Sequence, residues 1–130
     1  MKLSLLIIFG IMCLVTLSGC AQNPSDTPLI VRQNFDNIDL SNFQNCKGVF
    51  LVQDSYDIGL AVFVAGDVAK GEIAVGDKTN IDGNTIVVKT IEGNKKQWDK
   101  AIKTYRVGLN FERQITKESY KPNDLICFNP

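Results

Sequence analysis

The sequence of 130 residues contains no histidine. Histidine is the side chain whose ordinary pKa lies closest to neutral pH, and its imidazole is the commonest metal ligand in proteins. Its absence excludes Ser–His and Cys–His catalytic pairs, imidazole metal sites and the usual proton shuttle. We therefore assign no catalytic residue, no metal ligand and no cofactor, and we expect a protein that is not an enzyme.

The sequence also has no surplus of either charge, because 14 Lys and Arg residues balance 14 Asp and Glu residues. A nucleic-acid partner would call for a basic stripe, so none is expected. Long apolar runs are missing as well, except at the N-terminus. There Met1 and Lys2 precede a run over residues 3–17 that contains no acidic residue.

This N-terminal segment has the charged start and apolar core of a signal peptide. Its core of about 15 residues is shorter than the roughly 20 that a membrane-spanning helix needs. The alternatives are a transmembrane helix or a buried core helix. Against both, Ser18-Gly19-Cys20 and the following residues 21–24 do not continue a helical pattern.

Leu17-Ser18-Gly19-Cys20 resembles the lipobox of bacterial lipoproteins. The resemblance implies cleavage before Cys20, acylation of its sulfur and acylation of the new N-terminus. The chain would then be anchored to a membrane outside the cytoplasm. Because Ala21 rather than Asp follows the cysteine, the resemblance implies the outer membrane where the organism has one. Each buried acyl methylene contributes about 0.8 kcal/mol to such an anchor.

Removal of the first 19 of 130 residues leaves 111, enough for one compact domain. We divide the chain into a signal peptide (1–19), a lipidated cysteine with a tether and cover segment (20–45), and a β domain (46–130). Residues 21–33 are rich in Gln, Asn, Pro and Ser and are typical of a tether. Residues 34–43 fit either a short helical turn or an irregular cover.

Two of the four cysteines remain available for a disulfide. Cys13 leaves with the signal peptide, and Cys20 carries lipid. Outside the cytoplasm thiols tend to be oxidised, so we predict that Cys46 and Cys127 form a disulfide, with two free buried thiols as the alternative.

Short β-branched or aromatic runs predict an all-β fold. The expected strands cover residues 49–52, 60–65, 85–91, 107–111 and 124–128, with a turn at 53–57 and a hairpin turn at Asp82-Gly83. Residues 95–104 fit either one or two helical turns or a charged loop over one end of the fold. Strands at roughly ten-residue spacing indicate an antiparallel barrel or sandwich.

Residues 62–77 resemble the second, β-barrel domain of translational GTPases such as elongation factor Tu, most specifically over Lys70–Asp77. The resemblance extends over about Val49–Phe128 and implies a small closed antiparallel β-barrel. Glycines 66, 71 and 76 fall where such a barrel bends, and Asn123 replaces the glycine that precedes the last strand in that family. The phosphate-binding loop of the family's separate nucleotide domain is missing, so no nucleotide is expected.

Several polar groups are candidate sites. Lys95 and Lys96, with Lys100 and Lys103, form a basic face near Trp98 that would meet anionic lipid, an acidic partner or only solvent. Trp98, Tyr105 and Arg106 are residue types enriched at protein interfaces. The alternative for Trp98 is a plug in the open end of the barrel.

Acidic loops are the remaining candidates. Asp54 and Asp57 are a carboxylate pair of the kind used in glycoside cleavage, with turn residues as the alternative. Residues 77–84 hold two Asp and two Asn, but the EF-hand spacing would place Lys78 and Lys89 at ligand positions, which favours a solvated hairpin.

These features favour a lipid-anchored, non-catalytic binding module of the cell envelope that docks another protein. The first alternative is an inhibitor, immunity or phage-exclusion lipoprotein that acts on an incoming enzyme, toxin or phage. The second is a cell-wall hydrolase that uses carboxylates, for which histidine is not required.

Overall fold

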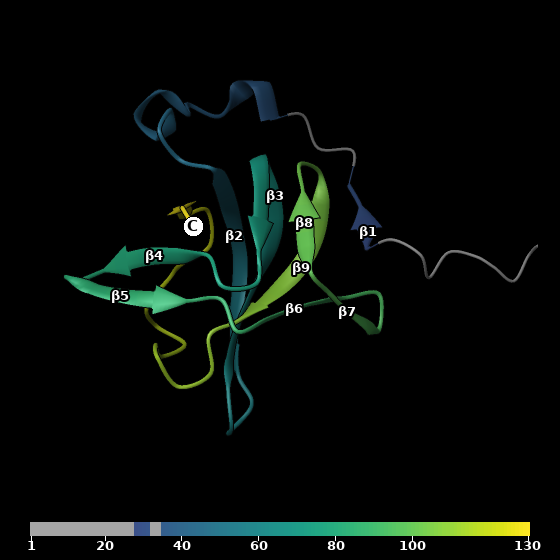
Figure 1. Cartoon of the computed structure of the whole chain (residues 1–130), viewed down its shortest axis with the longest axis vertical. Coiled ribbons are helices and arrows are strands. Elements are labelled where there is room, and N and C mark those ends of the chain that lie inside the picture. The colour runs from purple at the N-terminus through teal and green to yellow at the C-terminus, as the bar shows by residue number, and fades with distance from the viewer. Residues whose placement is uncertain (1–27, 32–34) are drawn as a thin grey trace, which may run out of the picture.

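A computed structural model describes residues 28–31 and 35–130 (Figure 1). The predicted signal peptide (1–19) and the acylated Cys20 lie outside the described residues. Within the described part of the chain, no helix has the length and apolar character needed to cross a membrane.

The fold is built almost entirely from antiparallel strands, which confirms the all-β prediction. The main sheet has the order β10-β2-β3-β9-β6-β7, with β1 paired to β9 and β8 paired to β3. A separate hairpin contains β4 and β5. The strands are β1 (Leu29–Ile30), β2 (Gly48–Asp57), β3 (Val62–Ala74), β4 (Lys78–Ile81), β5 (Asn84–Val87), β6 (Thr90–Gly93), β7 (Lys96–Trp98), β8 (Lys100–Ile102), β9 (Tyr105–Asn110) and β10 (Leu125–Phe128).

The β4–β5 hairpin extends the sheet at its β10 end. Its turn is the predicted Asp82-Gly83 pair, and both residues have positive φ angles, 51° and 84°. Positive φ at both central residues is the requirement of the type I′ turn that suits a two-residue hairpin. An isolated bridge pairs Lys78 with Asn129, so the hairpin continues from β10. The pairings of the described strands form an open path from β10 to β7, and closure into a barrel stays a prediction.

β3 is the longest strand and changes partner along its length. Phe63–Asp67 pairs with β9, whereas Glu72–Ala74 pairs with β8. Between these segments Gly71 has a φ of 62°, and a Cβ there would collide with the carbonyl oxygen of Lys47. Glycine alone accepts this conformation and this close approach without steric cost. The predicted bend at Gly71 is therefore what lets one strand serve two parts of the sheet.

One apolar core lies inside the fold. Its largest fully buried side chains include Phe50, Phe111 and Phe128, and the rings of the last two stack with centroids 6.2 Å apart. Alternate residues of β2, β3 and β9 supply most of the rest, as expected for strands with one buried face. At about 25 cal/mol for each Å² of apolar surface removed from water, this core is the main source of stability.

The cover segment forms two short 3₁₀ turns, η2 (Phe35–Asn37) and η3 (Ser41–Phe43). This agrees with the helical-turn alternative for residues 34–43. Phe35 is 5% exposed and packs with Leu51 and Ala69 in a second, smaller cluster outside the main core. In the region predicted as tether, Leu29–Ile30 form β1 against β9, so part of that region belongs to the sheet.

Two local predictions are wrong. Residues 53–57, expected as a turn, are the second half of β2 and pair with β3 as far as Asp57. A register shift between Val52 and Asp54 lets β2 continue with mostly exposed side chains, whereas Val62 and Val64 of the facing part of β3 stay in the core. Residues 95–104 form neither helical turns nor a loop, but β7 and β8 with a bend between them. Over such a short stretch, the spacing of the apolar residues fits both the helical period and the strand period. Pairing with neighbouring strands determined which of the two structures forms.

Candidate functional site

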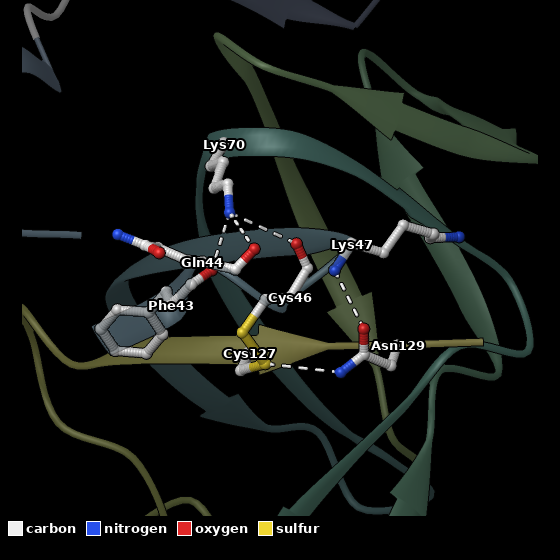
Figure 2. The surroundings of a disulfide bond; sticks show 7 residues. All are labelled: Phe43, Gln44, Cys46, Lys47, Lys70, Cys127 and Asn129. Atoms are coloured by element: carbon white, nitrogen blue, oxygen red, sulfur yellow. Dashed lines mark hydrogen bonds between the residues drawn. A yellow bond between two sulfur atoms is a disulfide. The ribbon is translucent and has the colours of Figure 1, made fainter. Parts of the chain in front are cut away.

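The predicted disulfide is present between Cys46 and Cys127, whose Cα atoms lie 5.4 Å apart. It ties the residue that follows the cover segment to the last strand, β10 (Figure 2). The Lys70 ammonium, drawn above it in the figure, donates to the carbonyl oxygens of Phe43 and Gln44 at 2.7 and 3.2 Å. Asn129 accepts from the backbone N–H of Lys47 at 3.0 Å. The disulfide and these bonds form a structural clamp over the end of the sheet.

Lys95, Lys96 and Trp98 come together on the β6–β7 hairpin. The Lys96 ammonium lies 5.9 Å from the centroid of the Trp98 ring, within the range of a cation–π contact. The indole N–H of Trp98 donates to the carbonyl oxygen of Gly93 at 2.7 Å, which fixes the ring. Trp98 is partly buried and packs against the main core. It therefore shares features of both alternatives considered for it, an exposed contact and a packed end of the core.

An open depression of about 490 Å³ lies beside these side chains and is lined by Glu92, Gly93, Lys95, Lys96 and Gln97. The predicted four-lysine face does not act as one unit, because Lys100 pairs with Glu72 at 3.6 Å on the β3–β8 side. β7 is the last strand of the sheet order, and no described strand pairs with its outer edge. The hairpin thus presents two lysines, part of an indole ring and a sheet edge together.

Arg106 and Tyr105 have structural roles within the fold. Arg106 donates from Nε and Nη2 to the Asp67 carboxylate at 2.7 and 3.1 Å. The Asp67 side chain is fully buried, and its hydrogen bond raises the pKa of Arg106 further above the ordinary value. Tyr105 packs against the core. Trp98, Tyr105 and Arg106 are residue types that are enriched at interfaces, but Tyr105 and Arg106 therefore serve the fold itself.

Asp54 and Asp57 lie on the exposed half of β2. Side chains of a strand alternate between its two faces, so residues three apart point to opposite sides. Asp57 accepts from the Gly59 backbone N–H at 2.9 Å and from Arg113 at 2.8 Å, and these two bonds, the first more than the second, lower its pKa. Asp54 accepts from the backbone N–H of Ser55 at 2.8 Å. This arrangement does not favour an acid–base pair.

The acidic loop around residues 77–84 is likewise used structurally. Asp77 is 4% exposed, pairs with Lys47 and accepts from the backbone N–H of Ala74 at 2.8 Å. Asn80 accepts from the Thr85 hydroxyl within the hairpin at 2.8 Å. Among the described residues, no three His, Cys, Asp or Glu side chains are grouped so that they could hold a metal ion.

Sequence reasoning placed the turn between these two strands at residues 53–57 and missed the exposed tip of the β2–β3 hairpin, which follows Asp57. Its tip exposes Tyr56, Ile58 and Leu60 by 51%, 64% and 88%. Beside its base is an open depression of about 440 Å³ lined by residues that include Ser55, Tyr120 and Lys121. Leu60 is the first residue of the apolar run 60–65 in the sequence, so the pattern predicted that it begins a buried strand. The Asp57-Ile58-Gly59 order, which is typical of an Asx turn, was the signal that could have placed the tip.

Tyr120 lines this depression, and the burial of its side chain can be tested by experiment. Burial, more than the neighbouring Asp124 and Asp82, raises its pKa from 10.0 to about 12. Because the folded pKa lies above the ordinary value, the neutral phenol favours folding fully below pH 10, and this contribution is lost as the pH rises toward 12. We expect Tyr120→Phe to remove that part of the alkaline loss of stability. Urea unfolding of both proteins at pH 7, 10 and 11.5 measures it.

At pH 7 the same variant should be as stable as the parent or up to about 1 kcal/mol more stable, since the buried hydroxyl has no hydrogen-bond partner among the described residues. Equal alkaline losses in the two proteins would contradict the assignment.

No protein-family model and no curated protein matches the sequence. Solved structures do share its fold. One is a crystal structure of a bacterial selenocysteine-specific elongation factor, with a TM-score of 0.55 and 20% identity over 65% of this chain. The match spans 15% of the length of that elongation factor, and at this identity it shows the fold alone. The chain therefore has a β fold of the kind found in translation elongation factors, as the sequence resemblance implies.

Proposed function

We propose that this chain is a lipid-anchored binding module of the cell envelope that docks another envelope protein through its β6–β7 hairpin. The anchor is Cys20, on the strength of the lipobox and the short apolar segment before it. The fold is compatible with binding and does not by itself imply any activity.

The observation that carries the docking proposal is the arrangement of Lys96 over the Trp98 ring at the outer edge of the sheet. A ring already fixed by its bond to Gly93 loses little freedom on binding. Trp supplies apolar contact area, and Lys95 and Lys96 supply charge complementarity to an acidic segment. An extended acidic segment could also add to the free edge of β7.

The test is a quantitative capture from membranes with the intact lipoprotein. Lys95→Glu/Lys96→Glu should weaken recovery of a stoichiometric envelope partner by about tenfold, equivalent to about 1.4 kcal/mol. The matched control is Lys78→Glu/Lys89→Glu, which makes the same charge change at two exposed lysines near the β4–β5 hairpin. Equal losses in both variants would contradict the assignment of the site.

The two alternatives give different outcomes. Capture of a secreted enzyme, toxin or phage protein would favour an inhibitor or immunity lipoprotein. Turnover of a cell-wall substrate, abolished by Asp54→Asn or Asp57→Asn, would favour a hydrolase. The anchor is tested separately by palmitate labelling of the parent chain and Cys20→Ala, of which only the parent should be labelled.

A further inference from the structure

The Cys46–Cys127 disulfide lies beside the surface, although the strand that carries Cys127 borders the apolar core. Both cysteines are half-buried, whereas Ile126 and Phe128, on either side of Cys127, are buried in the main core. Cys127 therefore faces away from the core, as alternate residues of a strand do. It lines an open depression of about 390 Å³, whose other lining residues are all polar: Lys78, Thr79, Asn80, Thr85 and Asn129. An incoming thiol can reach Cys127 through this depression.

Two ammonium groups and an amide lie close to the disulfide. The Lys70 ammonium donates to the carbonyl oxygen of Cys46 at 3.5 Å (Figure 2). Lys78 lines the same depression as Cys127. The Asn129 side-chain amide donates to Cys127 Sγ at 3.6 Å. Nearby cations stabilise a thiolate, which is both the attacking group and the leaving group when a disulfide is exchanged.

The two sulfur atoms differ in their surroundings. Cys46 directly follows the cover segment, and its N–H donates to the Phe43 carbonyl oxygen at 3.1 Å. Its carbonyl oxygen accepts from Lys70. Cys127 instead borders the open depression. An attacking thiolate therefore meets Cys127 Sγ, and Cys46 is the leaving sulfur, with the Lys70 ammonium close by.

We propose that Cys127 is a thiol–disulfide exchange site, at which a dithiol protein opens the bond to Cys46. In the first step, a thiolate of that protein bonds to Cys127 Sγ, the bond between the two cysteines breaks, and Cys46 leaves as a thiolate. In the second step, the other thiol of the dithiol protein attacks the mixed disulfide, and Cys127 leaves as a thiolate. Two electrons pass to this chain, and the protons of the two partner thiols end on Cys46 and Cys127.

The chemistry of the bond favours a dithiol over a single thiol as the reductant. A disulfide that stabilises a folded domain is itself stabilised by the fold and resists reduction by small monothiols. A dithiol closes its own disulfide in the second step, and this step is fast because it is intramolecular. Access at Cys127 and a dithiol partner together allow the native domain to react.

Exchange at Cys127 changes how the cover segment is held. The bond ties the end of that segment to β10, so its opening leaves the hydrogen bonds of Lys70 to Phe43 and Gln44 and the packing of Phe35. β10 and β7 stand at opposite ends of the main sheet order. The exchange site is therefore separate from the proposed docking hairpin and does not depend on it.

The first experiment measures the reduction of the full lipoprotein in detergent micelles by dithiothreitol, with alkylation and mass analysis of the products. Attack on the native domain predicts a rate that is proportional to the dithiothreitol concentration and unchanged by urea below the unfolding transition. Lys78→Met should slow the reaction about threefold, the size of a surface ion-pair effect. The matched control is Lys89→Met, which removes the same charge at an exposed lysine outside the depression and should leave the rate unchanged.

The second experiment identifies the sulfur that is attacked. The probe is a thioredoxin whose second active-site cysteine is replaced by serine, so that the mixed disulfide of the first step accumulates. Peptide mass mapping should find this adduct on Cys127 at least about tenfold more often than on Cys46, because only the attacked sulfur retains the probe.

Three outcomes would overturn the proposal. A reduction rate that is independent of the dithiothreitol concentration and rises with urea would mean that the bond opens only in unfolded chains. An adduct found mainly on Cys46 would show that the depression is not the route of attack. Equal rates for Lys78→Met and Lys89→Met would remove the role of the depression in guiding the thiolate.

Discussion

Removal of the Cys46–Cys127 disulfide is expected to lower the free energy of unfolding by about 4 kcal/mol, a large share of the stability of a small domain. The two cysteines are separated by 81 residues, so the bond closes a loop that includes most of the domain. In the chain-entropy model, a loop of this length restricts the unfolded chain strongly, and its loss stabilises the unfolded state. The clamp around Lys70 and Asn129 would remain but could not replace that restriction.

The measurement is urea unfolding of the parent protein and of Cys46→Ser/Cys127→Ser under oxidising conditions. The parent protein with its disulfide reduced is the control, and it should unfold at the same urea concentration as the double variant. The m-value should rise in both, since an unfolded chain without the cross-link exposes more surface. A loss below about 1 kcal/mol would mean that the reduced chain keeps much of its structure when unfolded.

Arg106→Met is the second large change, with an expected loss of about 3 kcal/mol in the free energy of unfolding. The Asp67 carboxylate is fully buried, and Arg106 supplies both of its charge-assisted hydrogen bonds recorded in the structure. Removing the guanidinium leaves that carboxylate without compensation in the interior. The Arg106 side chain itself is 38% exposed, which places the effect at the lower end of the range for buried pairs.

The matched second variant is Asp67→Leu/Arg106→Met, which removes both charges at once. It should recover most of the loss, because replacing a buried ion pair with apolar side chains is often neutral. Lys100→Met is the control at an exposed pair, since Lys100 and Glu72 lie 3.6 Å apart and their side chains are 58% and 41% exposed. We expect it to cost less than about 1 kcal/mol. No recovery in the double variant would show that Asp67 stabilises the fold through other contacts.

Arg106 also shows that the residue types in a segment do not by themselves reveal the role of each side chain. Trp, Tyr and Arg close together in sequence predict an interface, yet Arg106 pairs with a carboxylate 39 residues earlier in the chain. Asp67 stands in an apolar run, and nothing local identifies its partner. Only the pairing of β3 with β9 places the two residues opposite each other. Long-range pairing of this kind is invisible to spacing arguments.

Local features of the fold were predictable where backbone chemistry leaves one choice. Asp82-Gly83 forms the predicted turn, because both residues accept positive φ. Asn123 has a φ of 78°, in keeping with its tolerance of the left-handed conformation. The disulfide was also predictable, because the lipobox resemblance implies other fates for Cys13 and Cys20 and leaves Cys46 and Cys127 to pair. Residues 95–104 were not, because β7 and β8 are each three residues long and gain their structure from the strands beside them.

The sequence by itself determined the all-β class, the two cysteines that pair and the Asp82-Gly83 turn. The class and the turn follow from local chemistry, namely β-branched runs and side chains that tolerate unusual φ. The tertiary structure alone decided that Arg106 pairs with Asp67, and that Ile58 and Leu60 stand at a projecting hairpin tip. Those arrangements depend on which strands pair and in which register, and a one-residue change of register would move each side chain to the other face.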